Sequence, residues 1–344
     1  MFNIDKAVPM MGMGGGGGGG GGACYTYPDA PATPGEVTPD VTFDRGIYMN
    51  GSITMDDGVS IEIWGFTDGG GGMGGGGMGG GGMGGGGNQF PSPAMRVTEG
   101  QVVHTNLSVN GMMWLHTIHH HGIEPSQEND GVGHYSFDVD GTYTYQWKAS
   151  HAGTYFYHCH TNTVLHAEMG MYGGLIIDPP EGPGTLHSGG PTYDVEAIWA
   201  CDEIDSSWHN KNWDAGTCGG DEGFNSLNPD YFIITGVDGA QSALTNPAVA
   251  VTMNRGQKLL VRYICAGYLP QRINFGGLTA TIHISDGRVL PNPVQVTEIE
   301  ASSAERYDCI FEPTEAGVYE VSCDFLDWVT GAVVGTARTR ITVN

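Results

Sequence analysis

Short apolar runs alternate with polar turn residues along most of the chain. The runs are rich in Val, Ile, Thr and Tyr, and clusters of Gly, Asn, Asp and Pro separate them. No stretch keeps the period of an amphipathic helix, whereas several keep the two-residue alternation of a half-buried strand. The pattern therefore predicts an all-β fold of the sandwich type.

The predicted strands repeat once along the chain. The segment EGQVVHTNLSVN at 99–110 corresponds to RGQKLLVRYICAG at 255–267, and GTYFYHCH at 153–160 corresponds to GVYEVSCD at 317–324. Two copies of one β-domain thus account for 344 residues, about twice the usual domain length. We expect a Gly-rich tail at 1–34 and domains at 35–180 and 181–344, which meet near the Pro- and Gly-rich segment at 178–191.

Two glycine-rich segments interrupt this pattern, at 14–22 and 69–87. Such runs are typical of flexible coil, and an ordered run would need packed strands or a subunit interface to hold it. Met73, Met78 and Met83 recur every five residues in the second segment, so they do not line one face of a strand or of an extended helix. A spacer or packing role is favoured over a methionine cluster that binds copper(I).

The chain is strongly acidic, with 38 acidic and 13 basic residues and a net charge of −25. This charge disfavours nucleic acid and anionic membranes as partners, and it favours metal cations or basic proteins. No window is apolar enough to span a bilayer, so we expect no membrane span, and the N-terminal residues lack the apolar core of a signal peptide. We expect any export signal to have been removed already.

Seven cysteines without a CxxC pair predict disulfide bonds plus one odd thiol rather than a zinc site. Among the pairings, spacing favours only Cys201 with Cys218, which flank a short polar loop. Disulfides indicate a secreted protein, so we expect an extracellular, periplasmic or cell-surface location.

Two clusters of histidine carry the candidate chemistry: HTIHHHG at 116–122 and HCHTNTVLHAEMGM at 158–171. A thiolate, imidazoles and a thioether together select copper over zinc, for which Met is a poor ligand. Because adjacent strand residues point to opposite faces, HCH offers its thiolate to one metal and both imidazoles to another. A pH sensor would explain the histidines but not Cys159 or Met171.

These motifs resemble those of the multicopper oxidase and copper nitrite reductase superfamily, HxxHxHG and HCH followed by His and Met. The resemblance implies two tandem cupredoxin-like Greek-key β-sandwich domains and copper as cofactor. It implies a type 1 copper with the ligands His116, Cys159, His166 and Met171. It also implies type 2 and type 3 coppers on His119, His121, His158 and His160.

Three details accompany this resemblance. His120 stands between two ligand positions and should point to the opposite face. His166 follows Cys159 by seven positions instead of five, which predicts a two-residue insertion in this loop. Asp130, in an Asp-Gly-Val turn, is a candidate proton carrier, although an Asp-Gly pair also marks an ordinary turn.

The second domain lacks nearly every copper ligand of the family pattern, although Cys323 keeps the type 1 cysteine. Asn274, Gly276, Ser322 and Asp324 take the places of type 2 and type 3 ligands, and Gln271, Cys323, Thr330 and Gly335 take those of type 1 ligands. Complete four-electron reduction of oxygen is therefore disfavoured. Asp324 of a neighbouring subunit could complete a single copper site, and His209 and His283 could contribute only if folding brings them close.

Two functions remain open from the sequence. The first is a copper redox protein that exchanges electrons with a partner protein or a small reductant. The second is a structural subunit that retains copper and assembles through its glycine-rich tail, as a filament or, by family resemblance, as a trimer. In both cases we expect a homo-oligomer.

Overall fold

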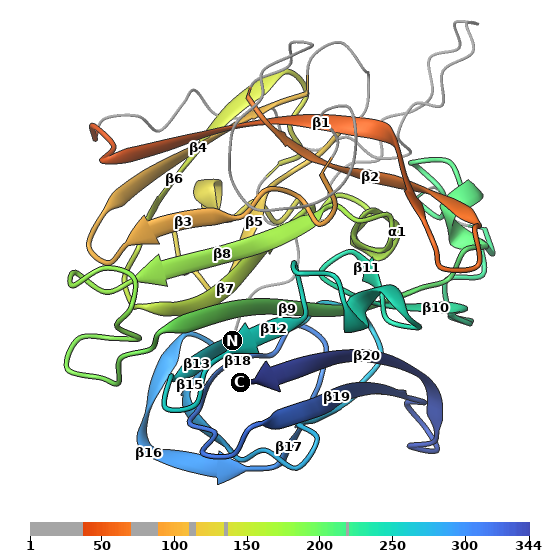
Figure 1. The fold of residues 1–344 in the computed structure, drawn as a ribbon. Coiled ribbons are helices and arrows are strands. Elements are labelled where there is room, and N and C mark those ends of the chain that lie inside the picture. The colour runs from red at the N-terminus through yellow and green to blue at the C-terminus, as the bar shows by residue number, and fades with distance from the viewer. Residues whose placement is uncertain (1–36, 70–88, 110–114, 134–136, 218–219) are drawn as a thin grey trace, which may run out of the picture.

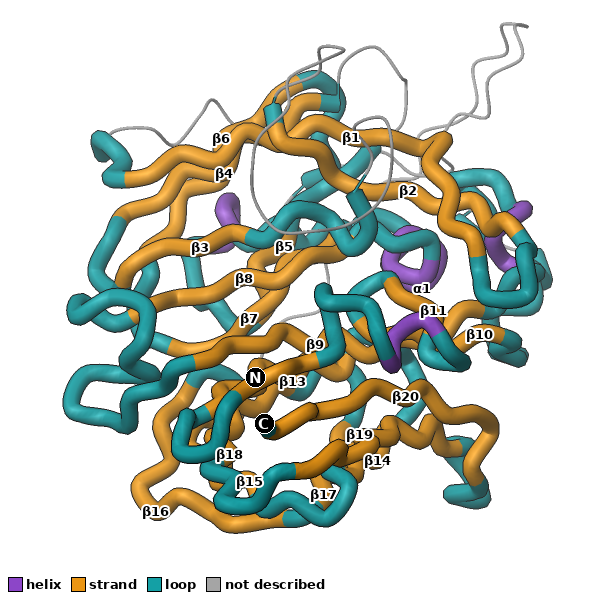
Figure 2. Tube along the Cα trace, in the orientation of Figure 1, coloured by secondary structure: helices purple, strands orange, loops and turns teal. Residues whose placement is uncertain are grey.

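The computed structural model describes residues 37–69, 89–109, 115–133, 137–217 and 220–344. Within these residues the regular secondary structure is almost entirely β-strand, joined by loops and a few short helical turns (Figure 2). The tail at 1–34 and the Met-containing part of the segment at 69–87 lie outside the described residues. The expectations for these two segments therefore stay predictions.

The first half of the chain forms two four-stranded sheets that face each other (Figure 1). One sheet has the order β2-β1-β4-β6, from β1 (Val41–Thr54), β2 (Ser60–Asp68), β4 (Val102–Ser108) and β6 (Thr142–Lys148). The other has the order β3-β8-β7-β5, from β3 (Met95–Thr98), β5 (His119–His121), β7 (Gly153–His158) and β8 (Tyr172–Asp178). The 3-10 turn η1 (Gln127–Asn129) follows β5, and the helix α1 (Thr163–Glu168) joins β7 to β8.

The second half forms a seven-stranded and a five-stranded sheet. The first has the order β11-β10-β9-β13-β18-β15-β16, from β9 (Val195–Ile204), β10 (Tyr231–Ile234), β11 (Val237–Asp238), β13 (Leu259–Cys265), β15 (Ala280–Ser285), β16 (Arg288–Val296) and β18 (Arg306–Phe311). The second has the order β12-β20-β19-β14-β17, from β12 (Val251–Met253), β14 (Gln271–Asn274), β17 (Glu298–Ala301), β19 (Gly317–Leu326) and β20 (Val333–Val343). Two 3-10 turns, η2 (Trp208–Asn210) and η3 (Ser242–Leu244), lie in the connections.

The two halves repeat each other strand for strand. The set β2-β1-β4-β6 corresponds to β10-β9-β13-β18, and β3-β8-β7-β5 corresponds to β12-β20-β19-β14. The pairings repeat as well: β1 runs parallel to β4 as β9 does to β13, and β3 runs parallel to β8 as β12 does to β20. The fold is therefore all-β, with two tandem cupredoxin-like Greek-key sandwiches, which confirms the predicted class.

Each sandwich encloses its own apolar core. The first core includes Trp64, Phe66, Leu175 and Cys159, and the second includes Trp199, Phe275, Phe311 and Cys323. Cys159 of the candidate copper site thus lies inside the first core. Two residues from beyond β9, Trp208 and Ala215, also belong to the first core, so the second half of the chain helps to close the first sandwich.

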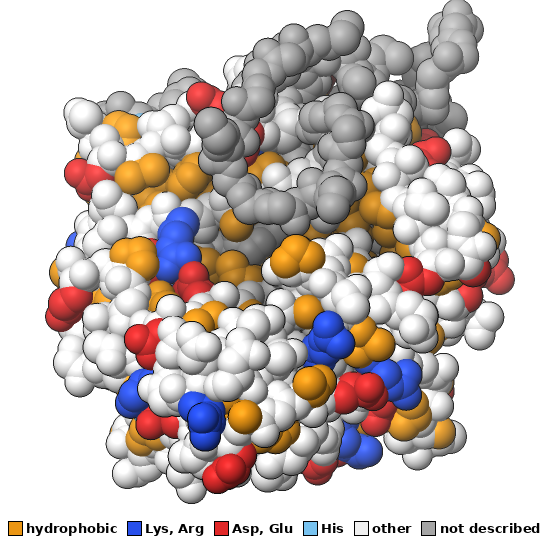
Figure 3. All heavy atoms as spheres, in the orientation of Figure 1, with side chains coloured by type: hydrophobic (Ala, Val, Ile, Leu, Met, Phe, Trp, Pro, Cys, Tyr) orange, Lys and Arg blue, Asp and Glu red, His pale blue; other side chains and the backbone are white. Residues whose placement is uncertain are grey.

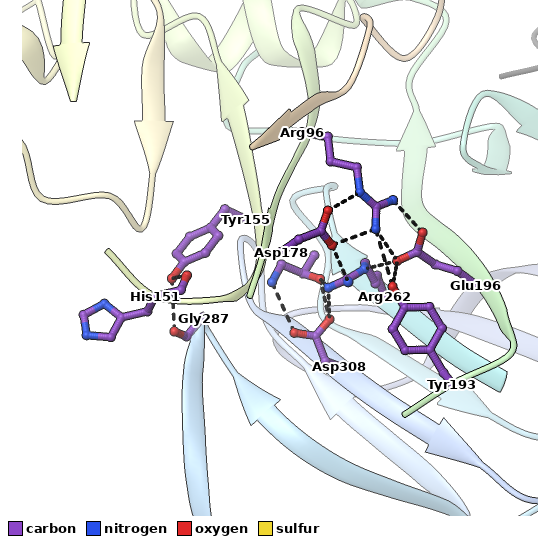
Figure 4. A network of polar contacts seen from close by, with 10 residues as sticks. Arg96, His151, Tyr155, Asp178, Tyr193, Glu196, Arg262, Gly287 and Asp308 are labelled. Atoms are coloured by element: carbon purple, nitrogen blue, oxygen red, sulfur yellow. Dashed lines mark hydrogen bonds and ion pairs between the residues drawn. The ribbon is translucent and has the colours of Figure 1, made fainter. Parts of the chain in front are cut away.

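A network of charged side chains joins the two sandwiches (Figure 4). The guanidinium of Arg262 on β13, which is fully buried, lies 2.7 Å from Glu196 and 3.3 Å from Asp308. Arg96 on β3 binds Asp178 through two nitrogens, at 2.6 and 2.7 Å, and also reaches Glu196 at 2.6 Å. On the outer face seen in Figure 3, acidic and basic side chains are interspersed rather than gathered by sign.

The cysteines differ from the disulfide prediction. Of the seven, five lie in the described residues, and all five are buried and free: Cys159, Cys201, Cys265, Cys309 and Cys323. The last four sit on strands inside the second core, where a thiol packs as a small apolar side chain. Cys24 and Cys218, the expected partner of Cys201, lie outside the described residues.

No helix in the described part of the chain is long and apolar enough to cross a membrane.

Candidate copper centres

Strands β5 and β7 place the histidine clusters beside each other. They pair antiparallel with His119 opposite His158 and His121 opposite Phe156. His116, three residues before β5, forms an isolated bridge to Val139. The side chains of successive residues alternate between the core and the outer rim, so the two motifs contribute to two separate groups of ligands.

The first group contains Cys159, His116 and His166, all fully buried. The Cys159 sulfur lies 3.6 Å from Nδ1 of His116 and 3.4 Å from Nδ1 of His166. Met171 is also buried, and its backbone ties the group together: its carbonyl accepts a hydrogen bond from Cys159 N, and its N–H donates to the His166 carbonyl, both at 3.0 Å. Two imidazoles and the Cys159 sulfur thus lie together, and Met171 is buried in the same core.

The surroundings of this group favour a bound cation. Burial lowers the pKa of His116 well below its usual range and lowers the pKa of His166 to about 4. Both imidazoles are therefore neutral at pH 7, as metal ligands must be. Burial also raises the pKa of the Cys159 thiol to about 11, although backbone N–H groups of Thr117 and Thr161 oppose this. A cation that replaces the thiol proton would remove this penalty.

The second group contains His119, His121 and His158, whose ligand nitrogens lie within 4.8 Å of one another. The His160 ring joins them, with its centroid 5.5 Å from that of His119 and 5.7 Å from that of His158. Burial, followed by the charge of Arg306, lowers the pKa of His121 to about 3. Burial also lowers the pKa of His158 well below its usual range. Four imidazoles therefore lie together on one side of β5 and β7.

Hydrogen bonds orient three of these rings. Nδ1 of His119 donates to the Asp130 carbonyl at 2.7 Å, and Nδ1 of His158 donates to the Cys159 carbonyl at 2.9 Å. Nδ1 of His160 contacts the Thr163 hydroxyl at 3.1 Å. Each bond occupies Nδ1 and leaves Nε2 available as a ligand, which is the arrangement that fixes metal-binding histidines.

Asp130 lies at the rim of the second group. One of its carboxylate oxygens is 3.4 Å from Nδ1 of His119, and the side chain is 33% exposed. The turn is held by Gly131, whose φ of +71° leaves no room for a side chain, because a Cβ would lie 2.0 Å from the Ile118 carbonyl oxygen.

His120 points away from both groups, as the alternation predicted. It is buried on the opposite face, 3.0 Å from the Thr105 hydroxyl, and its ring packs against Trp147. Burial lowers its pKa to about 3. His209 donates to the Glu62 carbonyl and approaches Glu168, while His283 on β15 lies near His187. Neither His209 nor His283 belongs to the two groups found in the described residues.

The strand register identifies the second-domain equivalents of these ligands. Cys323 pairs with Ile273, and Asn274 pairs with Ser322, as His119 pairs with His158. Gln271 corresponds to His116, and its side-chain oxygen lies 3.6 Å from the Cys323 sulfur. An amide and a hydroxyl thus stand where the first domain has imidazoles.

One aligned position is corrected by the structure. Cys323 pairs with Ala337 on β20, as Cys159 bonds to Met171, so the equivalent of Met171 is Ala337 and not Gly335. Gly335 lies opposite Phe325, two residues closer to the turn. The loop is a short hairpin in which Thr330 bonds to Asp327, and its different length shifted the sequence alignment.

Sequence reasoning missed two residues that contact the groups from the second half of the chain. The carbonyl of Trp213 accepts a hydrogen bond of 2.9 Å from Nε2 of His166. The Arg306 guanidinium packs over the Phe156 ring and against Gly122, where a Cβ would lie 2.5 Å from its nitrogen. A backbone carbonyl has no residue-type signature, so the first contact had no signal in the sequence.

A buried cysteine between two imidazoles, with histidines on the other side of the same strand of a Greek-key sandwich, defines a cupredoxin-type copper protein. A family model described as multicopper oxidase matches residues 83–182. Copper resistance protein A of Pseudomonas syringae pv. tomato is 29% identical over 289 residues, which cover 73% of this chain and 45% of that protein. The chain thus spans about half the length of the curated relatives it matches.

Solved structures agree with this class. A blue copper oxidase from Nitrosomonas europaea is 25% identical, with a TM-score of 0.68 and coverage of 88% of this chain and 86% of that one. The copper nitrite reductase of Nitrosomonas europaea, 16% identical with a TM-score of 0.64, shares the fold over 88% of this chain and 93% of that one. The family model and these similarities support the superfamily of multicopper oxidases and copper nitrite reductases, which implies copper as the cofactor.

Proposed function

We propose that the chain holds a type 1 copper on His116, Cys159, His166 and Met171 and transfers electrons through it. The observation that carries this proposal is the buried Cys159 sulfur, which lies 3.6 and 3.4 Å from two neutral imidazole nitrogens. A copper ion in that place supplies reversible one-electron chemistry. The chain's residues exclude water from it, because His116, Cys159 and His166 are 0% exposed.

The second group, His119, His121, His158 and His160, is proposed as half of a type 2 and type 3 copper centre. Cys159 is covalently joined to His158 and His160 on either side, so a short path of bonds connects the two groups. The described residues of the second domain offer Asn274 and Ser322 at the facing positions, which are not imidazoles. We therefore infer electron transfer with a partial second centre rather than a complete four-electron oxidase.

Asp130 is the proposed proton carrier of the second centre. Its carboxylate lies at the rim, partly in solvent, and close to the ring nitrogen of His119. A carboxylate in this position can exchange protons with water and pass them to a group bound at the histidines.

The test is to load the purified chain with copper, record its absorption and electron paramagnetic resonance spectra, and count copper per chain. The proposal expects an intense thiolate-to-copper band near about 600 nm. One copper per chain indicates electron transfer alone. Additional copper that does not increase the thiolate band indicates an occupied second centre. A copper-loaded chain without the band would refute the type 1 assignment.

A matched pair of cysteine variants makes this test specific. Both Cys159 and Cys309 are buried and free, but only Cys159 lies among histidines. Cys159→Ser should abolish the band and keep copper at the second group, whereas Cys309→Ser should keep the band. Loss of the band in both variants would point to a general loss of folding.

The partners and location follow from the same proposal. We propose a small reductant or a redox protein as electron donor, a homo-oligomer as the working state, and an extracellular, periplasmic or cell-surface location. The alternative role as a self-assembling subunit depends on residues 1–34 and 69–87, most of which lie outside the described residues. Deletion of residues 1–34 followed by a particle-size measurement tests it, since unchanged assembly would exclude the tail.

A further inference from the structure

The segment that follows β9 covers the end of the first sandwich where the type 1 ligands lie. We call residues 205–217 the cap. Trp208 and Ala215 of the cap belong to the core of the first sandwich, and Trp213 packs against that core. The cap is therefore an integral part of the site, although it comes from the second half of the chain.

The cap is fastened to the loop that carries His166. The side-chain amide of Asn162 donates to the carbonyls of Trp213 and Ala215, both at 3.0 Å. The backbone N–H of Asp205 donates to the buried Glu168 carboxylate at 2.7 Å. Three hydrogen bonds thus hold the cap against α1 and the turn before it.

The cap closes the outer edge of His166. Nδ1 of His166 faces the Cys159 sulfur, and Nε2 on the far side of the ring donates to the Trp213 carbonyl at 2.9 Å. The His166 side chain is 0% exposed. A donor in solvent consequently cannot touch the ring, and the next group outward along this bond is Trp213 itself.

Trp213 reaches from the copper ligand to the protein surface. Its carbonyl bonds to His166, while its indole is half-buried and keeps a face in solvent. We propose that electrons reach the type 1 copper through Trp213, and that the charge around Trp213 selects cationic donors. This inference rests on the type 1 copper proposed above. The donor loses one electron, copper(II) becomes copper(I), and no bond or proton changes place.

The connection that contains Trp213 carries more acidic than basic side chains. Asp214 is adjacent, and the exposed carboxylates Asp221, Glu222 and Asp230 follow in the same connection. The cation Lys211 lies 3.8 Å from Glu222, which offsets part of its charge. A cationic one-electron reductant would be attracted to this surface and an anionic one repelled.

The test measures the rate at which two small complexes, hexaammineruthenium(II) and hexacyanoferrate(II), reduce the type 1 copper in stopped flow. Trp213→Ala should slow reduction by the cationic complex about tenfold, or about 1.4 kcal/mol in activation free energy. Trp213→Phe should restore most of the rate, because an aromatic ring remains. The absorption band and the reduction potential should stay unchanged in both variants, since the peptide carbonyl at 213 is retained.

A second exposed tryptophan provides the matched control. Trp328 is 60% exposed on the β19–β20 hairpin of the second sandwich, and Trp328→Ala should leave every rate unchanged. The proposed route would be overturned if Trp213→Ala reduced the type 1 copper as fast as the unmodified protein does. It would also be overturned if Trp328→Ala slowed this reduction as much as Trp213→Ala. Absence of the type 1 band in the unmodified protein would instead refute the copper assignment, so the two failures are distinguishable.

Two further measurements test the charge selection. Asp214→Asn combined with Glu222→Gln should slow the cationic complex and speed the anionic one. In the copper-free protein, the fluorescence of Trp213 is obtained by subtracting the emission of Trp213→Phe from that of the unmodified chain. Cs⁺ should quench this fluorescence more strongly than iodide does. Equal quenching by both ions, or rates that do not depend on donor charge, would contradict the selection of cations.

Discussion

The buried guanidinium of Arg262 provides the sharpest test of how the two sandwiches are held together. Arg262→Met removes the charge and keeps a side chain of similar reach. Asp308, which is 1% exposed, would lose the cation 3.3 Å away, and Glu196 would lose a partner at 2.7 Å. Removal of one partner from a buried ion pair costs about 3–5 kcal/mol.

Arg96 reduces this loss, because it still binds Asp178 and Glu196. We therefore expect the lower end of the range, about 3 kcal/mol, and a fall in the midpoint of thermal unfolding of about 4 °C. The assay is thermal and urea unfolding followed by circular dichroism. Arg272→Met is the matched control, since Arg272 forms an exposed pair with Glu300 at 2.7 Å and its loss should change stability little.

The pH dependence gives a second readout. Burial raises the pKa of Asp308, and Arg262 opposes that rise. Without Arg262 the pKa of folded Asp308 rises further, so the folded variant binds more protons than the unfolded chain. The stability of Arg262→Met should therefore recover as pH falls toward 5, relative to the unmodified protein. Equal stability of the Arg262 and Arg272 variants at neutral pH would refute this account of the interface.

Three further predictions concern single residues. Burial, followed by the charge of Glu168, raises the pKa of Asp202 from 3.8 to about 8. The folded protein therefore loses stability as pH rises toward 8 and this carboxyl group loses its proton. Asp202→Asn should reduce this loss of stability between pH 5 and 8, measured by urea unfolding. Gly131→Ala should displace His119 and lower copper content at the second group, measured by metal analysis, because its Cβ would overlap the Ile118 carbonyl. His120→Leu should keep the copper content and lower the free energy of unfolding by about 1 kcal/mol, because one buried hydrogen bond is lost.

The sequence predicted the sandwiches and the two ligand groups because both depend on local patterns. The alternation in HCH separates Cys159 from its neighbours on any strand, and the order of soft ligands narrows the metal to copper. The position of Ala337 was not predictable, because it depends on the length of a hairpin rather than on a motif. Free thiols such as Cys201 look the same in a sequence whether they pack in a core or form disulfides.

The contacts between the two halves were beyond sequence reasoning for a different reason. The Trp213 carbonyl and His166 are separated by 47 positions, and any residue type supplies a carbonyl. In the sequence, Arg306 looks like any arginine of a surface ion pair, and only the fold places it beside Gly122 and Phe156. Such contacts depend on how the sandwiches pack, which no local period encodes.

The second sandwich has kept its fold while its own copper positions have changed, and its contacts suggest why the fold is retained. Through the cap it buries the outer edge of His166, and through Arg306 it sets a positive charge near His121. Both effects require a fixed placement of the two sandwiches, which the buried network around Arg262 provides. A domain whose described core lacks a histidine and cysteine ligand group can therefore still control access to, and the charge around, the ligands in its neighbour.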